Sequence, residues 1–325
     1  SDLLRFLCLF SFSKFFYLVR ASAWRFKVNT LASQDTELSI TPRFCGFSAT
    51  IEGLNLSASL SSQSIQQIQN YWLDYPVLVI TKQNISDLDQ VKFAKNFGNL
   101  EIHPSVAHRS TKTPEIYRVS NVDENNQIME AKSTAWQYLE LTWLWHTDSS
   151  FREIPSLGSI LHGIEIPPTG GDTLFADMTK AFDALPKPEQ ERISTLNVFH
   201  SHDYIVSQSK ALSSRENKGQ YESLPRVKHP LVRRHPVTKK QSLFLSPHTM
   251  ESIVELKEQE GRVLLDDLIH HATQHQFVYR HKWKVDDVLM WDNRCTRHAV
   301  LPYDSINHRR VMHRTTVIGD SVPKA

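Results

Sequence analysis

The chain alternates short apolar runs with polar turns, a pattern that predicts many strands and few helices. Runs rich in apolar and β-branched residues, which are typical of buried strands, cover residues 75–81, 116–122, 159–166, 276–279, 288–291 and 310–318. Apolar residues at helical spacing predict helices over residues 57–71, 87–97 and 255–273. We therefore expect a mainly β fold with flanking helices, an antiparallel sandwich or jelly roll rather than a parallel α/β sheet.

Local signals place further elements in the second half of the chain. Asp177 is expected to cap a helix that ends before Pro186, and Pro188 to open another. Residues 231–234 and 242–245 are expected to pair as a hairpin. In the longest predicted helix, over residues 255–273, the buried stripe should contain Val263, Leu264, Leu268, Ile269 and Ala272.

Residues 1–34 differ in composition from the rest of the chain. They carry five basic residues against the single acid Asp2, and Phe, Leu and Ser dominate. The uncharged run over residues 6–13 is too short for a spanning helix, which needs about 20 apolar residues, so no membrane span is expected. Two interpretations stay open, an organellar transit segment and an extension foreign to the native protein. Residues 35–325 are predicted to form a single domain.

Composition narrows the class of protein. The chain has 325 residues, of which 40% are hydrophobic. Its formal net charge of +2 is too small for an electrostatic field that would indicate nucleic acid as a partner. Its three cysteines lack paired spacing, which favours a reducing compartment such as the cytoplasm, or an organelle if residues 1–34 are a transit segment. The pair Gly170–Gly171 predicts a turn, because it does not belong to a glycine-rich phosphate loop.

Histidine and aspartate supply the candidate chemistry. His146 and Asp148 form an HxD triplet, and on a strand residues i and i+2 point to the same face. By itself the triplet also fits a simple polar pair. His298, which follows the strand and polar turn at residues 288–294, offers a second imidazole. Two nitrogens and one oxygen leave open positions that suit non-haem Fe(II), whereas a structural zinc needs four ligands.

Two arginines near the end of the chain indicate anion binding. Arg310 and Arg314 are four residues apart in a predicted strand, so they share a face. Two inward-facing arginines cannot be buried without anions, and each can clamp a carboxylate through two hydrogen bonds. The pair then implies two anionic molecules, a cosubstrate and a substrate. The alternative is a pair of surface arginines on an edge strand.

At this point the sequence resembles the taurine dioxygenase and 2,4-dichlorophenoxyacetate dioxygenase (TauD/TfdA) family of Fe(II)- and 2-oxoglutarate-dependent oxygenases. The resemblance covers about residues 39–320 and is carried by four ordered motifs, WHTDSSF (145–151), GGDTLFADM (170–178), WDNR (291–294) with His298, and RRVMHR (309–314). It implies a double-stranded β-helix, or jelly roll, with iron on His146, Asp148 and His298. It implies that Thr173 and Arg310 hold the distal carboxylate of 2-oxoglutarate, and that Arg314 lies near the substrate or cosubstrate anion.

The resemblance also implies an activity, the hydroxylation of a small anionic substrate coupled to oxidation of 2-oxoglutarate by O₂. The segment Asn121–Asp123 favours the 2,4-dichlorophenoxyacetate branch. His103 matches a substrate-contacting histidine of the taurine branch, but that branch has tyrosine where this chain has Val106. A taurine or alkylsulfonate dioxygenase is therefore the alternative. Three further histidines either line the pocket or, as we expect for most, are surface or structural residues: His200, His202 and His248.

Two other classes of protein share parts of this pattern. A non-catalytic, cupin-like binding protein would use the same jelly roll without turnover, but the intact ligands and both arginines speak against it. A zinc hydrolase would use the same three ligands and would work without O₂. The sequence does not fix the oligomeric state, and a homo-oligomer is compatible with it.

Overall fold

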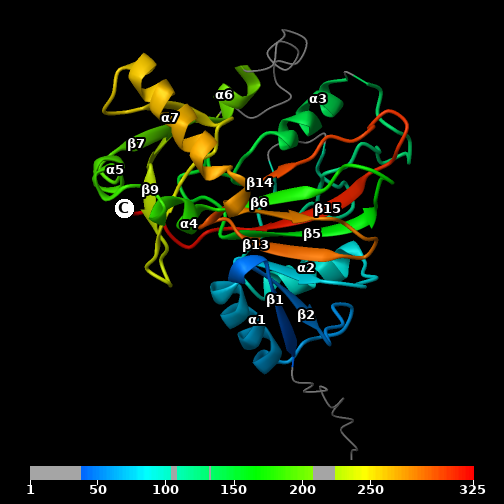
Figure 1. Ribbon diagram of the computed structural model, residues 1–325. Helices are drawn as coiled ribbons and strands as arrows, with labels where there is room; N and C mark the ends of the chain where they lie inside the picture. The colour runs from blue at the N-terminus through cyan, green and yellow to red at the C-terminus, as the bar shows by residue number, and fades with distance from the viewer. Residues whose placement is uncertain (1–37, 104–107, 132, 208–223) are drawn as a thin grey trace, which may run out of the picture. The chain divides into compact units, whose positions relative to one another are not determined.

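The computed structural model describes residues 38–103, 108–131, 133–207 and 224–325. Seven strands form its largest sheet (Figure 1). Neighbouring strands are antiparallel except for the parallel pair β2–β3. The order across the sheet is β1 (Ser39–Arg43), β2 (Ser48–Glu52), β3 (Val77–Ile80), β13 (Val288–Asp292), β5 (Gly158–Glu165), β15 (Val311–Val317) and β4 (Tyr117–Arg118). Its central strands are apolar and buried, as their continuous hydrophobic runs predicted.

A three-stranded antiparallel sheet packs over one face of the large sheet. Its strands are β12 (Val278–His281), β6 (Thr173–Asp177) and β14 (Thr296–Val300). Phe175 of β6 lies in the core between the two sheets, and its ring centroid is 5.3 Å from that of Trp291 on β13. Two facing sheets, antiparallel except for the pair β2–β3, with helices outside them form a jelly roll, which confirms the predicted fold class.

Smaller sheets and helix α7 extend the second layer. One sheet contains β11 (Met250–Ile253), β7 (Asn197–His200) and β8 (Val227–Pro230), and the predicted hairpin is the pair β9 (Val232–Arg234) and β10 (Gln241–Leu243). Helix α7 (Glu258–Ala272) buries Leu264, Leu265 and Leu268 against these strands. The predicted position of Val263 in the buried stripe is wrong: Val263 is 57% exposed, because the stripe passes through Leu265 instead.

The remaining helices begin where the sequence offers caps. Helix α1 (Ser62–Asp74) is capped by Ser61 and so starts later than predicted, while α2 (Asp87–Lys95) has a complete capping box with Ser86. Asp177 caps α4 (Met178–Asp183) as predicted, and proline opens α5 (Lys187–Ile193). The short helices α3 (Thr134–Glu140) and α6 (His202–Ser207) complete the set in the described residues.

The described residues from Leu38 onward belong to one compact unit, Asp35–Ala325. The predicted extension, residues 1–34, lies outside the described residues, as does Val106. Among the helices of the described part, none has the length and apolar character needed to cross a membrane.

Candidate active site

The two imidazoles of the predicted triad come together through backbone pairing. His146 and His298 form an isolated antiparallel bridge in which each backbone N–H donates to the other carbonyl at 2.9 Å. His298 belongs to β14, but His146 lies outside the regular strands and Asp148 lies in a turn whose next residue, Ser149, has a positive φ of 52°. The expectation that the HxD triplet sits on a strand is therefore wrong, because a single bridge and a turn bring the side chains together.

The three side chains converge on one point. One ligand atom each from His146, Asp148 and His298 lies within 4.8 Å of the others, and all three residues are buried. Each imidazole Nε2 is 3.9 Å from a carboxylate oxygen of Asp148. The Nδ1 atom of His146 is 2.8 Å from the carbonyl oxygen of Leu144, which turns its Nε2 toward the shared point. Two nitrogens and one oxygen at this spacing fit a divalent metal with open positions.

The Asp148 carboxylate is held in its ionised form. Ser159 donates a hydrogen bond of 2.6 Å to Oδ2, and Arg314 donates to Oδ1. Burial by itself would raise the pKa of Asp148, but Arg314, with the two imidazoles, outweighs it and keeps the pKa below its usual range. Burial also lowers the pKa of His298 well below 6.5 and the pKa of His146 to a smaller extent. An anionic carboxylate and neutral imidazoles are the forms that bind metal.

A second group of potential ligands is already satisfied by internal hydrogen bonds. His235, Asp292 and Cys295 also lie within 4.8 Å of one another. However, Nδ1 of His235 accepts from the backbone N–H groups of Val237 and Thr238, and Nε2 lies 3.0 Å from Asp292. Arg294 donates two further bonds to Asp292. Because both ring nitrogens and the carboxylate are in use, this group stabilises the turn after β13 rather than offering free ligands.

Arg310 is a buried cation without a carboxylate partner in the described part of the chain. It is 2% exposed, its Nε donates to the carbonyl of Gly171 at 3.1 Å, and its Nη2 has no partner. Burial lowers the pKa of Arg310 to about 10, although the negative charge near it opposes this. A guanidinium in such a place needs an anion, and the distal carboxylate of 2-oxoglutarate fits it. The alternative of a surface arginine pair is wrong, since Arg314 is only 7% exposed.

Thr173 lies two residues after Gly171, at the start of β6. Its buried hydroxyl accepts a hydrogen bond of 2.9 Å from Trp283, so the hydroxyl proton is left to donate to another acceptor. Gly170 and Gly171 form the predicted turn, with φ of 74° and 69°. A Cβ on Gly171 would lie 3.2 Å from the Arg310 side chain. Glycine at this position therefore leaves room for the Arg310 side chain.

A narrow cavity of about 50 Å³ opens beside the triad. Its walls include His103, Arg314 and three aromatic residues, Phe151 of the WHTDSSF motif together with Tyr117 and Tyr138, which belong to no motif. The guanidinium carbon of Arg314 lies 4.7 Å from the ring centroid of Tyr117, and the ring of His103 lies 4.3 Å from it. The cavity therefore combines one cation with aromatic walls.

The three additional histidines have different places. His248 lines the cavity, and its ring centroid is 5.0 Å from that of His146. His202 is buried against Phe151, with ring centroids 4.8 Å apart. His200 is fully buried behind the site and bonds Thr249 through Nδ1 at 2.8 Å. His200 and His202 are buried, which fits the structural alternative of the expectation, whereas His248 is the one of the three that lines the cavity.

The buried imidazoles predict an acid-sensitive fold. Burial lowers the pKa of His108 and of His229 to about 4 from an ordinary value of 6.5. Their stabilising effect is therefore complete above the unfolded-state pKa of 6.5 and is lost as pH falls toward about 4. Each should cost up to about 1.4 kcal/mol per pH unit in that window. Urea unfolding of the metal-free protein between about pH 7.5 and pH 5 should show this fall, and a constant free energy of unfolding would contradict it.

A jelly roll that brings two histidines and one aspartate together, and that also buries an arginine without a carboxylate partner among the described residues, defines a non-haem iron oxygenase of the 2-oxoglutarate-dependent class. Residues 38–316 match the model of the taurine catabolism dioxygenase TauD, TfdA family. The chain belongs to this family of dioxygenases, as its motifs predicted.

Individual relatives agree with this assignment. The chain is 36% identical over 280 residues to the alpha-ketoglutarate-dependent 2,4-dichlorophenoxyacetate dioxygenase of Cupriavidus pinatubonensis, covering 85% of this chain and 96% of the relative. It is 33% identical to an alpha-ketoglutarate-dependent sulfonate dioxygenase of Saccharomyces cerevisiae, covering 85% and 65%. The crystal structure of AAD-2 with Mn(II) and N-oxalylglycine superposes with a TM-score of 0.79 at 36% identity, over 89% of this chain and all of that one.

Proposed function

We propose that the protein hydroxylates a small organic anion, most like an aryloxyalkanoate, in a reaction that consumes 2-oxoglutarate and O₂ at Fe(II). The observation that carries the proposal is the convergence of His146, Asp148 and His298 within 4.8 Å, in a chain that also buries Arg310 with an unpartnered Nη2. Relatives at 36% and 33% identity are 2,4-dichlorophenoxyacetate and sulfonate dioxygenases that depend on alpha-ketoglutarate. A non-catalytic binding protein and a zinc hydrolase do not fit this membership.

Different residues of the site would bind the iron and orient 2-oxoglutarate. His146, Asp148 and His298 would hold the iron, and Ser159 and Arg314 fix the carboxylate of Asp148. Arg310 and Thr173 would bind the distal carboxylate of 2-oxoglutarate and so set its orientation. The iron, with 2-oxoglutarate and O₂, supplies the oxidising power for a C–H bond. Because all three ligands are buried, the protein also keeps bulk water from the reacting atoms.

The walls of the cavity favour a substrate that carries an anionic group on an aromatic ring. Arg314 pairs with Asp148 and also borders the cavity, so its guanidinium is the cation that a substrate anion would approach. Tyr117, Tyr138 and Phe151 provide flat apolar walls that suit a ring better than a short alkyl chain. Hydroxylation at the carbon next to an ether oxygen would then release the aryl alcohol and an aldehyde. Taurine, which has no ring, is the alternative substrate.

A substrate panel tests the proposal. Purified protein with Fe(II), 2-oxoglutarate and O₂ should form succinate fastest with phenoxyacetate or 2,4-dichlorophenoxyacetate, and at least about tenfold more slowly with taurine. The controls omit O₂ or replace Fe(II) by Zn(II), and both should remove activity. Succinate formation that no anionic substrate stimulates, or turnover with zinc in the absence of O₂, would contradict the proposal. Cytoplasmic residence stays a prediction of the sequence, and a homo-oligomer stays compatible with it.

A further inference from the structure

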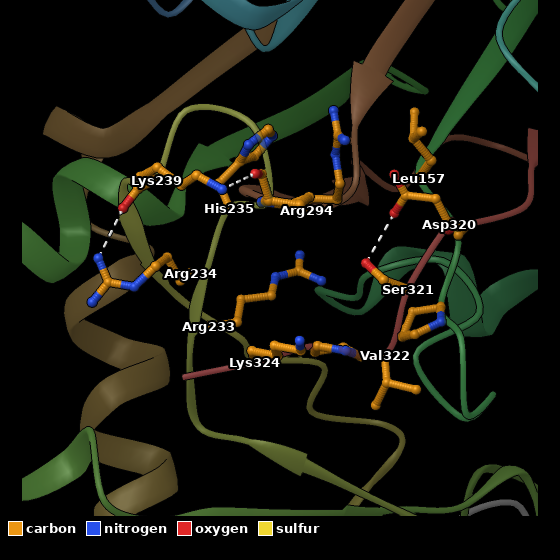
Figure 2. A pocket seen from close by; sticks show the side chains of 15 residues that line it. Leu157, Arg233, Arg234, His235, Lys239, Arg294, Asp320, Ser321, Val322 and Lys324 are labelled. Carbon is orange, nitrogen blue, oxygen red and sulfur yellow. Dashed lines mark hydrogen bonds between the residues drawn. The ribbon is translucent and has the colours of Figure 1, made fainter.

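A second cavity, of about 230 Å³, lies away from the iron site and shares none of its lining residues with the substrate cavity (Figure 2). It is formed by β9, by the turn after β13 and by the segment 319–324. Part of its wall is apolar, from Pro155, Leu157, Pro236, Val322 and Pro323. A cavity of this kind binds ligands with an apolar body when polar groups converge on it.

The charged residues of this cavity are nearly all basic. Asp320 is the single acid, and the five cations are Arg233, Arg234, Lys239, Arg294 and Lys324. Arg294 is neutralised by its two bonds to Asp292. The other four have no carboxylate within ion-pair distance among residues 38–103, 108–131, 133–207 and 224–325, where the structure is described. The cavity therefore has an excess of positive charge, which Asp320 and the nearby Asp292 offset only in part.

Arg233 is the buried member of this group. It is 4% exposed, and its guanidinium packs on the ring of Phe244, 4.0 Å from the centroid. Its Nη2 donates a hydrogen bond to the carbonyl oxygen of Asn293, but its Nε has no hydrogen-bond partner. In Figure 2 its side chain extends between those of Arg294 and Lys324. A guanidinium buried with an unpaired N–H is costly unless an anion binds it, and its flat fork suits a carboxylate.

We propose that this cavity is a second anion-binding site, which takes a small carboxylate with an apolar body. The carboxylate would bind the guanidinium of Arg233, which borders the cavity, with help from Lys324, and the apolar body would lie against Leu157, Pro236 and Val322. The proposal does not depend on the substrate of the iron site, because the two cavities have no residue in common.

The site is joined to the iron ligands by hydrogen bonds. Asn293, whose carbonyl accepts from Arg233, donates through its side-chain amide to Ser156 at 2.9 Å and to Ser159 at 3.0 Å. Ser159 in turn donates to Asp148. Binding at Arg233 is therefore connected to the position of the carboxylate that would hold the metal.

The test uses 4-bromobenzoate as the probe on the 325-residue protein. Crystals soaked in the probe should show a bromine anomalous peak in the cavity beside Arg233. In solution, calorimetric titration should show saturable binding at this site in addition to any at the iron site. Arg233→Gln and Lys324→Gln should each weaken it, by about tenfold or more for Arg233→Gln. Lys282→Gln, which changes an exposed lysine outside the cavity, is the matched control and should bind as the unchanged protein does.

Lys324→Gln alters an exposed side chain, so it keeps the test decisive if Arg233→Gln fails to fold. A bromine peak in the cavity together with a binding event that both cavity variants weaken supports the site. An empty cavity, or binding that Lys324→Gln leaves at the strength seen with Lys282→Gln, overturns the proposal. A peak found only in the crystal, with no matching event in solution, overturns it as well.

Discussion

Replacing Asp148 by alanine is expected to abolish turnover while leaving the fold in place. Asp148 is the one carboxylate in the triad, and both imidazole Nε2 atoms face it at 3.9 Å. Without it two neutral ligands are left, and the neighbouring Arg314 adds an unpaired positive charge that repels a divalent metal. Since the metal supplies the chemistry, kcat/KM should fall by about three orders of magnitude or more.

The measurement pairs activity with metal titration and circular dichroism. Asp287→Ala is the matched control, because Asp287 is also buried and bonds a histidine, His281, at 3.1 Å outside the site. This control should lose stability but keep metal binding and turnover. Asp148→Asn, which keeps the size of the side chain and the bond from Ser159, serves if the alanine variant is unstable. Retained turnover in a folded Asp148 variant would refute the ligand assignment.

Replacing Arg310 by alanine is expected to raise the KM for 2-oxoglutarate much more than it lowers kcat. The guanidinium is fully buried, and its Nη2 lacks a partner, so a bound carboxylate would use it without competition. Loss of one member of such a buried charge pair should raise KM by about a hundredfold. Initial rates at varied 2-oxoglutarate and saturating substrate measure the change.

Two variants make this result specific. Arg310→Lys keeps the charge but not the flat fork, so its KM should lie between those of the unchanged protein and the alanine variant. Arg309→Ala removes the adjacent arginine, which pairs with Glu165 at 2.6 Å near the surface, and should leave KM within about twofold. An unchanged requirement for 2-oxoglutarate in Arg310→Ala would contradict the role of Arg310.

The sequence predicted what periodicity and residue type determine. Buried strands such as β3 and β13 are continuous apolar runs, and Asp177 caps the helix that it was expected to cap. The triad could also be predicted from the sequence, because His146 and Asp148 stand two residues apart and His298 belongs to a motif of the family.

Other features depend on contacts between distant segments, which periodicity does not encode. Val263 fits the helical stripe as well as Leu265 does, and only the strands beneath α7 decide which one is buried. Tyr117 and Tyr138 reach the substrate cavity from segments with no motif of their own. Likewise, nothing local to Arg233 indicates that its guanidinium lies beside Asn293, 60 residues later in the chain.

The central claim is that three side chains from distant parts of the chain hold one metal ion. Anomalous diffraction from crystals of the protein grown with Mn(II) tests it most directly. We expect a single manganese peak bonded to Nε2 of His146, Nε2 of His298 and a carboxylate oxygen of Asp148. A crystal in which manganese is missing from these three residues, or is bound instead by His235, Asp292 and Cys295, would contradict it.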